Sequence, residues 1–142
     1  MLTLDQASAI ADAALAEGRN RGFHPLCVVV LDPGAHPLVV KRDERASIYR
    51  PEIATGKAAG CLGMGFGGRE LARRSQAMPA FFTAIASAFP KGMVPVPGGV
   101  LIRDKSGVLI GAVGISGDTS DNDEICAVAG IAAAGLEADT GA

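Results

Sequence analysis

Two short runs of β-branched residues, separated by a loop of only six residues, constrain the fold of this chain more than any other feature. The first run is Leu26–Leu31 and the second is Leu38–Arg42, and the loop between them contains Asp32, Pro33 and Gly34. A loop this short joins antiparallel strands, because a parallel pair needs a crossover connection of about a dozen residues or more. This part of the chain therefore predicts a β-hairpin.

The rest of the chain adds a second hairpin and several helices. Val100–Arg103 and Val108–Ser116 are predicted strands around the turn Asp104–Gly107. Apolar periodicity predicts helices over Thr3–Glu17, Glu52–Leu62, Arg69–Ser75 and Pro79–Phe89, and a last helix from Ser120 or Asp121 to Leu136. Helices that cover an antiparallel sheet give a layered α+β fold. We expect a single domain over residues 1–142, since that length is typical of one domain.

The core of such a fold must be built from small and branched residues. The chain holds 25 alanines and 19 glycines, whereas only 4% of its residues are aromatic. Residues without a large side chain let two backbones approach closely. We therefore expect tight packing of the helices on the sheet.

Charge and hydropathy exclude several classes of protein. Lys and Arg number 13 against 15 Asp and Glu, which excludes nucleic-acid binding by bulk positive charge. No apolar stretch reaches the roughly 18 residues of a membrane span, and the N-terminus carries no basic signal-peptide region. We expect no membrane association and a cytoplasmic location. The three cysteines, Cys27, Cys61 and Cys126, are odd in number and widely spaced, which favours buried reduced thiols.

The segment Gly63-Met64-Gly65-Phe66-Gly67-Gly68 matches the glycine pattern of dinucleotide-binding loops. That pattern carries meaning after a strand and before a helix, with an acidic residue about 20 positions further on. Here it follows a predicted helix, and residues 81–89 contain no acid. We interpret it as a bend between two helices.

The chain contains two histidines, His24 and His36, which are too few for a metal site made of several imidazole ligands. A single histidine is enough to provide an axial ligand to haem iron. Either histidine is therefore a candidate metal ligand only if haem binds.

Basic residues beside strand ends and glycines suggest an anion site. Arg42 ends the second strand, Lys57 lies on a helical face of small residues, and Gly98-Gly99 offers unblocked backbone N–H groups. If these groups converge, they bind a small carboxylate or a propionate. The alternative is that Arg42 and Lys57 are ordinary surface charges.

Several segments together resemble one family. They are Val28–His36, Lys41–Asp43, Lys57–Ala59, Pro97–Ile102, Gly111–Gly117, Asp121–Glu124 and Ala129–Ile131. These segments look like those of the GlcG/HbpS-type family, which also includes the C-terminal domain of PduO-type proteins. The resemblance implies a profilin-like fold, with a five-stranded antiparallel sheet and helices packed around it, and assembly into homo-oligomers.

Some members of that family bind haem. The resemblance therefore implies a small-ligand-binding oligomer that takes haem or another tetrapyrrole through the carboxylates of the ligand. Carried over by position, the pocket would draw on Arg42, Lys57, Gly98, Gly99 and Asp123, with His36 matching a frequent histidine of the family. The chain departs from the family pattern at Ala35 and Asp118, where glycine is usual.

Two other hypotheses stay open. One is an enzyme, an isomerase, hydratase or decarboxylase, in which Arg42 or Lys57 binds a small carboxylic acid and Asp123 or Glu52 moves a proton. The other is an assembly protein with a vestigial pocket. Asp123 also has a purely structural interpretation, because a helix dipole favours acids in the first turn. Convergence of Arg42, Lys57 and Asp123 on a concave pocket would favour a ligand or a substrate.

Overall fold

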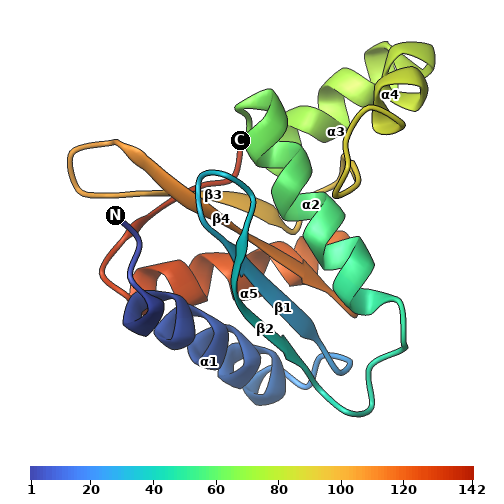
Figure 1. Cartoon of the computed structure of the whole chain (residues 1–142). Helices are drawn as coiled ribbons and strands as arrows, with labels where there is room; N and C mark the ends of the chain where they lie inside the picture. Colours follow the sequence, from blue (N-terminus) through green and yellow to red (C-terminus); the bar gives the residue numbers. More distant parts are fainter.

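The computed structural model describes all 142 residues and contains five helices and five strands (Figure 1). In chain order these are α1 (Leu4–Asn20), β1 (Cys27–Leu31), β2 (Pro37–Arg42), α2 (Arg50–Met64), α3 (Gly68–Ala77), α4 (Pro79–Ala86), β3 (Gly99–Arg103), β4 (Leu109–Ser116), α5 (Ser120–Ala133) and β5 (Glu137–Asp139). The α+β fold class is confirmed. None of the helices combines the length and the apolar character that a membrane crossing requires.

All five strands form one antiparallel sheet in the order β2-β1-β4-β3-β5. The two predicted hairpins are β1–β2 and β3–β4, and β1 pairs with β4 at the centre of the sheet. This is the five-stranded antiparallel sheet that the family resemblance implies.

The end of the last helix differs from the prediction. α5 ends at Ala133 rather than at Leu136, because Gly135 has a φ of 74°, a left-handed conformation that terminates a helix. The next residues form β5. Its Asp139 forms an ion pair with Arg103 of β3, with a distance of 3.0 Å between the guanidinium nitrogen and the carboxylate oxygen. A strand of three residues carries no alternating apolar pattern, so the sequence does not predict it.

The sheet lies between two helical layers (Figure 1): α1 and α5 cover one face, and α2 covers the other, with α3 and α4 beyond it. Alternate residues of β1 point to opposite faces. Val28 and Val30 belong to the core with α1 and α5, whereas Val29 and Leu31 belong to the core with α2. Because both faces are covered, every residue of β1 is buried, which explains its uninterrupted apolar sequence.

Small residues bring the helices into contact with neighbouring backbones. A Cβ on Gly114 of β4 would overlap the carbonyl oxygen of Ala54 in α2. On the other face, a Cβ on Gly130 of α5 would lie 2.5 Å from the carbonyl oxygen of Ile10 in α1. The tight packing expected from the alanine and glycine content is therefore present in both layers.

The glycine-rich segment 63–68 is a bend between two helices, as predicted. Gly65 ends α2 with a φ of 81°, and its N–H donates to the carbonyl of Cys61 at 2.8 Å. Gly67 leaves room for the C-terminal tail, whose Thr140 carbonyl accepts the N–H of Arg69 at 3.0 Å. The segment follows a helix rather than a strand, so it lacks the structural context of a dinucleotide site.

The three cysteines are buried and unpaired, as predicted. Cys126 lies in the core with α1 and α5, whereas Cys27 and Cys61 lie in the core with α2. Burial raises the pKa of Cys27 and Cys126 to about 11 and the pKa of Cys61 to about 12. All three are therefore protonated structural thiols at neutral pH.

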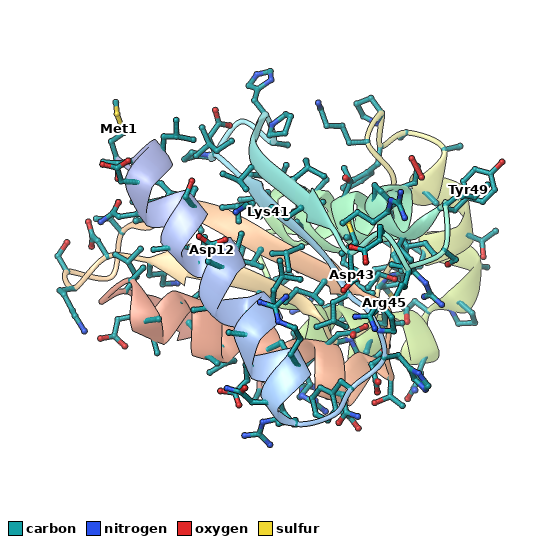
Figure 2. All side chains as sticks on the ribbon, turned by 90° about the horizontal axis from the view of Figure 1, so that it is seen from below. Met1, Asp12, Lys41, Asp43, Arg45 and Tyr49 are labelled. Atoms are coloured by element: carbon teal, nitrogen blue, oxygen red, sulfur yellow. The ribbon has the colours of Figure 1, made fainter.

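Both edges of the sheet carry features that discourage pairing with a further strand. β2 holds Pro37, Lys41 and Arg42, and β5 has only three residues. Figure 2 shows Asp12 of α1 opposite Lys41, and the ion pair between them measures 2.5 Å. α1 is thus linked to the β2 edge as well as to the core.

The turn between β1 and β2 holds Ala35 in a left-handed conformation, with a φ of 65°. Asp32 fixes this turn, because its Oδ1 accepts the backbone N–H of Gly34 at 2.9 Å and that of His36 at 3.0 Å. This conformation costs a residue with a Cβ about 1–2 kcal/mol. The turn therefore strains Ala35, at the position where the family resemblance leads us to expect glycine.

We predict that Ala35→Gly raises the free energy of unfolding by about 1 kcal/mol, because glycine adopts a positive φ without this cost. Urea unfolding followed by circular dichroism measures the change. Ala9→Gly is the matched control: Ala9 is exposed in α1, where the same substitution should lower the free energy of unfolding by about 1 kcal/mol. A lower free energy of unfolding for Ala35→Gly would contradict the interpretation that Ala35 is strained.

Candidate functional site

The predicted site residues Lys57 and Asp123 lie together in the protein interior. Lys57 is 4% exposed and Asp123 is 1% exposed. The Nζ of Lys57 donates to Oδ2 of Asp123 at 3.0 Å and to the carbonyl oxygen of Ile115 at 2.8 Å. The other carboxylate oxygen of Asp123 accepts the backbone N–H of Asp118 at 3.0 Å. One buried ion pair therefore joins α2, β4 and α5.

Gly98 and Gly99 border this ion pair. Gly98 has a φ of 107°, and a Cβ there would come within 2.9 Å of the Lys57 Nζ. The carbonyl of Gly98 accepts the N–H of Ile115 at 3.0 Å. Gly99 lies against α2, where a Cβ would be 2.5 Å from the Lys57 carbonyl oxygen. The structure thus brings Lys57, Asp123, Gly98 and Gly99 together in mutual contact in the interior.

Arg42 and Glu52 lie apart from this cluster. The Arg42 guanidinium donates to the backbone carbonyls of Ala46 at 2.7 Å and Asp43 at 3.2 Å, and it thereby holds the turn after β2. No hydrogen bond or ion pair links Arg42 to Asp123. Glu52 is exposed in the first turn of α2. Arg42 and Lys57 therefore each have separate partners within the protein.

The two histidines lie at opposite ends of β1. His24 precedes this strand, and its backbone N–H donates to Oδ2 of Asp118 at 2.7 Å. His36 lies in the turn that follows the strand. Both residues are exposed. No three His, Cys, Asp or Glu side chains come close enough to one another to hold a metal ion.

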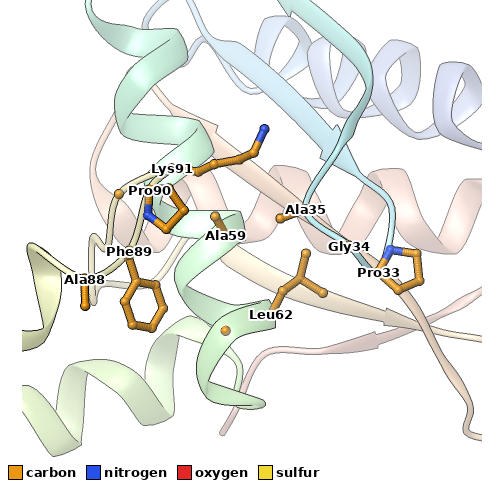
Figure 3. A pocket seen from close by; sticks show the side chains of 11 residues that line it. Pro33, Gly34, Ala35, Ala59, Leu62, Ala88, Phe89, Pro90 and Lys91 are labelled. Carbon is orange, nitrogen blue, oxygen red and sulfur yellow. The ribbon is translucent and has the colours of Figure 1, made fainter.

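A surface cleft of about 360 Å³, which we call the hairpin cleft, lies beside the β1–β2 turn. Its floor is α2, and its sides are the turn and the segment 88–92 that follows α4 (Figure 3). Its lining residues are Pro33, Gly34, Ala35, Ala59, Leu62, Gly63, Ala88, Phe89, Pro90, Lys91 and Gly92. None of the predicted site residues Arg42, Glu52, Lys57, Gly98, Gly99 and Asp123 is among them.

Three glycines on one face of α2 receive side chains from residues 89–94, a stretch that overlaps the side of the hairpin cleft formed by the segment 88–92. They follow the helical spacing i, i+4, i+7, and each receives one side chain: Val94 on Gly56, Met93 on Gly60 and Phe89 on Gly63. The N–H of Val94 also donates to the carbonyl of Gly56 at 3.1 Å. These contacts therefore hold one side of the cleft against α2.

His36 is next to the hairpin cleft in the chain, although it is not one of the lining residues. It directly follows the lining residues Pro33–Ala35, and its Cδ2 lies 3.2 Å from the position of a Cβ on Gly34. Of the residues selected from the sequence, His36 alone adjoins this cleft. The lining comes from three separate segments and has one polar side chain, that of Lys91, so no polar motif marks it. The one sequence signal is the spacing of Gly56, Gly60 and Gly63, which indicates that another segment crosses α2 there.

Removal of one partner from the buried ion pair should be costly. Burial raises the pKa of the Asp123 carboxyl, against the opposing effects of the Lys57 ammonium and the Asp118 amide. We predict that Asp123→Asn lowers the free energy of unfolding by about 3–5 kcal/mol, because the Lys57 charge stays buried without its partner. The double variant Lys57→Met/Asp123→Leu should recover part of this loss. Urea unfolding measures both, and a loss below about 1 kcal/mol for Asp123→Asn would contradict the prediction.

Asp118 joins the start of α5 to the loop before β1. Besides the N–H of His24, its carboxylate accepts the backbone N–H of Thr119 at 2.8 Å and the side-chain amide of Asn122 at 2.7 Å. Burial tends to raise the pKa of Asp118, but these hydrogen bonds and the nearby His24 side chain outweigh it and lower the pKa below its ordinary value. The folded state therefore favours the charged form.

The pH dependence of stability should reveal this preference. Because the pKa of Asp118 is lower in the folded than in the unfolded state, its stabilisation is present above about pH 4 and is lost as the pH falls through the folded-state pKa. We predict that Asp118→Asn is less stable than wild type near neutral pH and loses less stability on acidification below about pH 4. Urea unfolding at a series of pH values tests this. Parallel pH profiles for the two proteins would contradict the prediction.

Comparison with known proteins identifies a family and several solved structures that this chain resembles. A family model described as "Haem degrading protein HbpS-like" matches residues 2–132. The crystal structure of a PduOC:haem complex is 26% identical, with a TM-score of 0.84 over 96% of each chain. That of HbpS is 29% identical, with a TM-score of 0.79 over 92% of this chain and 88% of the other.

The Klebsiella pneumoniae protein ORFY shares the fold at 22% identity, with a TM-score of 0.80 over 94% of this chain and 90% of the other. None of the curated proteins matches the chain. The family match spans nearly all of the sheet and the helices that hold the hairpin cleft. The chain therefore belongs to the HbpS-like family, in agreement with the GlcG/HbpS resemblance of its sequence segments.

Proposed function

We propose that this protein binds a small ligand with a large apolar surface in the hairpin cleft, and that the ligand is haem or another tetrapyrrole. The observation that carries the proposal is a cleft of about 360 Å³ whose lining side chains are nearly all apolar, with the exposed His36 directly after the lining residues Pro33–Ala35 in the chain. Ligand sites are commonly apolar clefts of about 300–1,000 Å³ with a small number of polar groups. Membership of a family described as haem-degrading and the shared fold of the PduOC:haem complex support this choice of ligand.

The residues of the hairpin cleft suit an apolar ring. Ala59 and Leu62 on the floor and Phe89 at the side present carbon atoms, which bind a flat conjugated system through burial of apolar surface. His36 would hold the iron through an imidazole nitrogen, and one such axial ligand is sufficient. Bound haem would supply an iron centre with a strong Soret absorption band.

The cleft favours ligand binding over acid–base catalysis on a small carboxylic acid. Neither candidate proton-transfer residue, Asp123 or Glu52, lines it. Asp123 is instead held by Lys57 in the interior, where a substrate has no access. Assembly into homo-oligomers stays a prediction of the family resemblance, and light scattering with and without hemin tests it.

A hemin titration followed by the Soret band tests the proposal. We expect a saturable spectral change at micromolar hemin for the wild-type protein. His36→Ala should weaken binding by at least about tenfold and shift the band, because the iron loses its axial ligand. His24→Ala is the matched control: it removes the only other histidine, at the opposite end of β1, and it should bind hemin as wild type does.

Three outcomes would contradict parts of the proposal. Absence of a saturable change in wild type would exclude haem as the ligand. Equal effects of the two histidine substitutions would exclude His36 as the specific ligand of the iron. Normal binding by a His36→Ala/His24→Ala double variant would exclude axial ligation by histidine. Addition of ascorbate in air separates binding from breakdown, since loss of the Soret band with time would indicate degradation of the ring.

A further inference from the structure

A single charged side chain lines the hairpin cleft. Ten of the 11 lining residues are glycine, alanine, proline, leucine or phenylalanine, and the other is Lys91. Figure 3 shows the side chain of Lys91 reaching from the segment 88–92 in the direction of the turn that holds Ala35. The cleft therefore combines an apolar floor with one cation at its edge.

Lys91 is also the one lysine of the chain that has no acidic partner. The other three form ion pairs: Lys41 with Asp12, Lys57 with Asp123 and Lys105 with Glu137. The Lys91 ammonium makes neither an ion pair nor a hydrogen bond within the protein, although it borders an apolar surface. Its charge is thus available to a ligand.

The backbone holds Lys91 at this position. The N–H of Gly92 donates to the carbonyl of Phe89 at 3.0 Å, which closes a turn around Pro90 and Lys91. Gly92 has a φ of 92°, which few other residues adopt. Phe89 on one side of this turn is seated on Gly63 of α2. The backbone of Lys91 is therefore fixed at the cleft edge, so a ligand contact has to order only the lysine side chain.

An apolar surface beside an unpaired cation fits a ligand with an apolar body and an anionic group. We propose that the hairpin cleft selects amphipathic carboxylates, with the Lys91 ammonium as the partner of the carboxylate. This inference rests on the proposed function in that it concerns the same cleft, and for haem the carboxylate is a propionate. Lys91 thereby takes the role that the sequence suggested for Arg42 and Lys57.

Hemin and its dimethyl ester, compared in one dilute-detergent buffer, test the inference. The ester keeps the ring and the iron but has no carboxylate. We expect Lys91→Ala to weaken hemin binding about two- to fivefold, as for a partly exposed ion pair, and Lys91→Glu to weaken it further. Neither substitution should change binding of the ester. Added salt should reduce the difference between wild type and variants. Lys41→Ala and Lys41→Glu, on a strand that borders α1 rather than the cleft, are matched controls and should bind both compounds as wild type does.

The outcomes separate this inference from the proposed function. Wild-type affinity for hemin in both Lys91 variants would overturn the inference and leave haem binding intact. The same would follow from equal losses for hemin and its ester. If wild type binds no hemin, the fluorescent apolar anion 8-anilinonaphthalene-1-sulfonate replaces it as the probe. Lys91-dependent binding of this probe would support selection of an apolar anion by the cleft, and Lys91-independent or absent binding would overturn it. Unchanged thermal midpoints establish that the variants are folded.

Discussion

Direct backbone contact between α2 and the sheet is the constraint on which the rest of the structure depends. Gly114 of β4 and Gly99 of β3 have no side chains to hold α2 away, so the carbonyls of Ala54 and Lys57 reach the sheet surface. This closeness brings the Lys57 ammonium within hydrogen-bonding distance of Asp123 on α5. The ion pair therefore crosses the end of the sheet and connects the two helical layers. The same placement of α2 turns its outer face towards the segment that forms the hairpin cleft.

Patterns within short windows predicted most of the fold. The uninterrupted run Val28–Leu31 and the turn residues after it were sufficient for the first hairpin, because both strand propensity and turn chemistry are local. The Asp104–Gly107 turn was sufficient for the second hairpin for the same reason. β5 depends instead on pairing of Glu137–Asp139 with a strand more than 30 positions earlier, and nothing in those three residues indicates a strand. Its position follows from tertiary contacts alone.

The candidate site was less predictable than the fold, because the charged residues in the sequence do not indicate where the cleft lies. Lys57 and Asp123 are 66 positions apart, and spacing in the sequence cannot reveal that they neutralise each other in the interior. The charged residues that the sequence offers as site candidates, Lys57 and Asp123, thus stabilise the fold. The hairpin cleft is instead lined mainly by uncharged residues, which no sequence motif distinguishes. Lys91 becomes distinctive only after the partners of the other lysines are known. His36 could be selected in advance because it is one of two histidines in the chain.

The three buried thiols can report the separation of a helical layer from the sheet. Cys126 belongs to α5 and lies in the core between the sheet and the layer of α1 and α5, whereas Cys27 of β1 and Cys61 of α2 lie in the core between the sheet and α2. A thiol reagent reaches each sulfur only when the covering layer separates from the sheet, because burial both blocks access and disfavours the reactive thiolate. The labelling rates of these cysteines in the natural sequence therefore report which layer detaches first, and whether an occupied cleft slows the layer that contains α2.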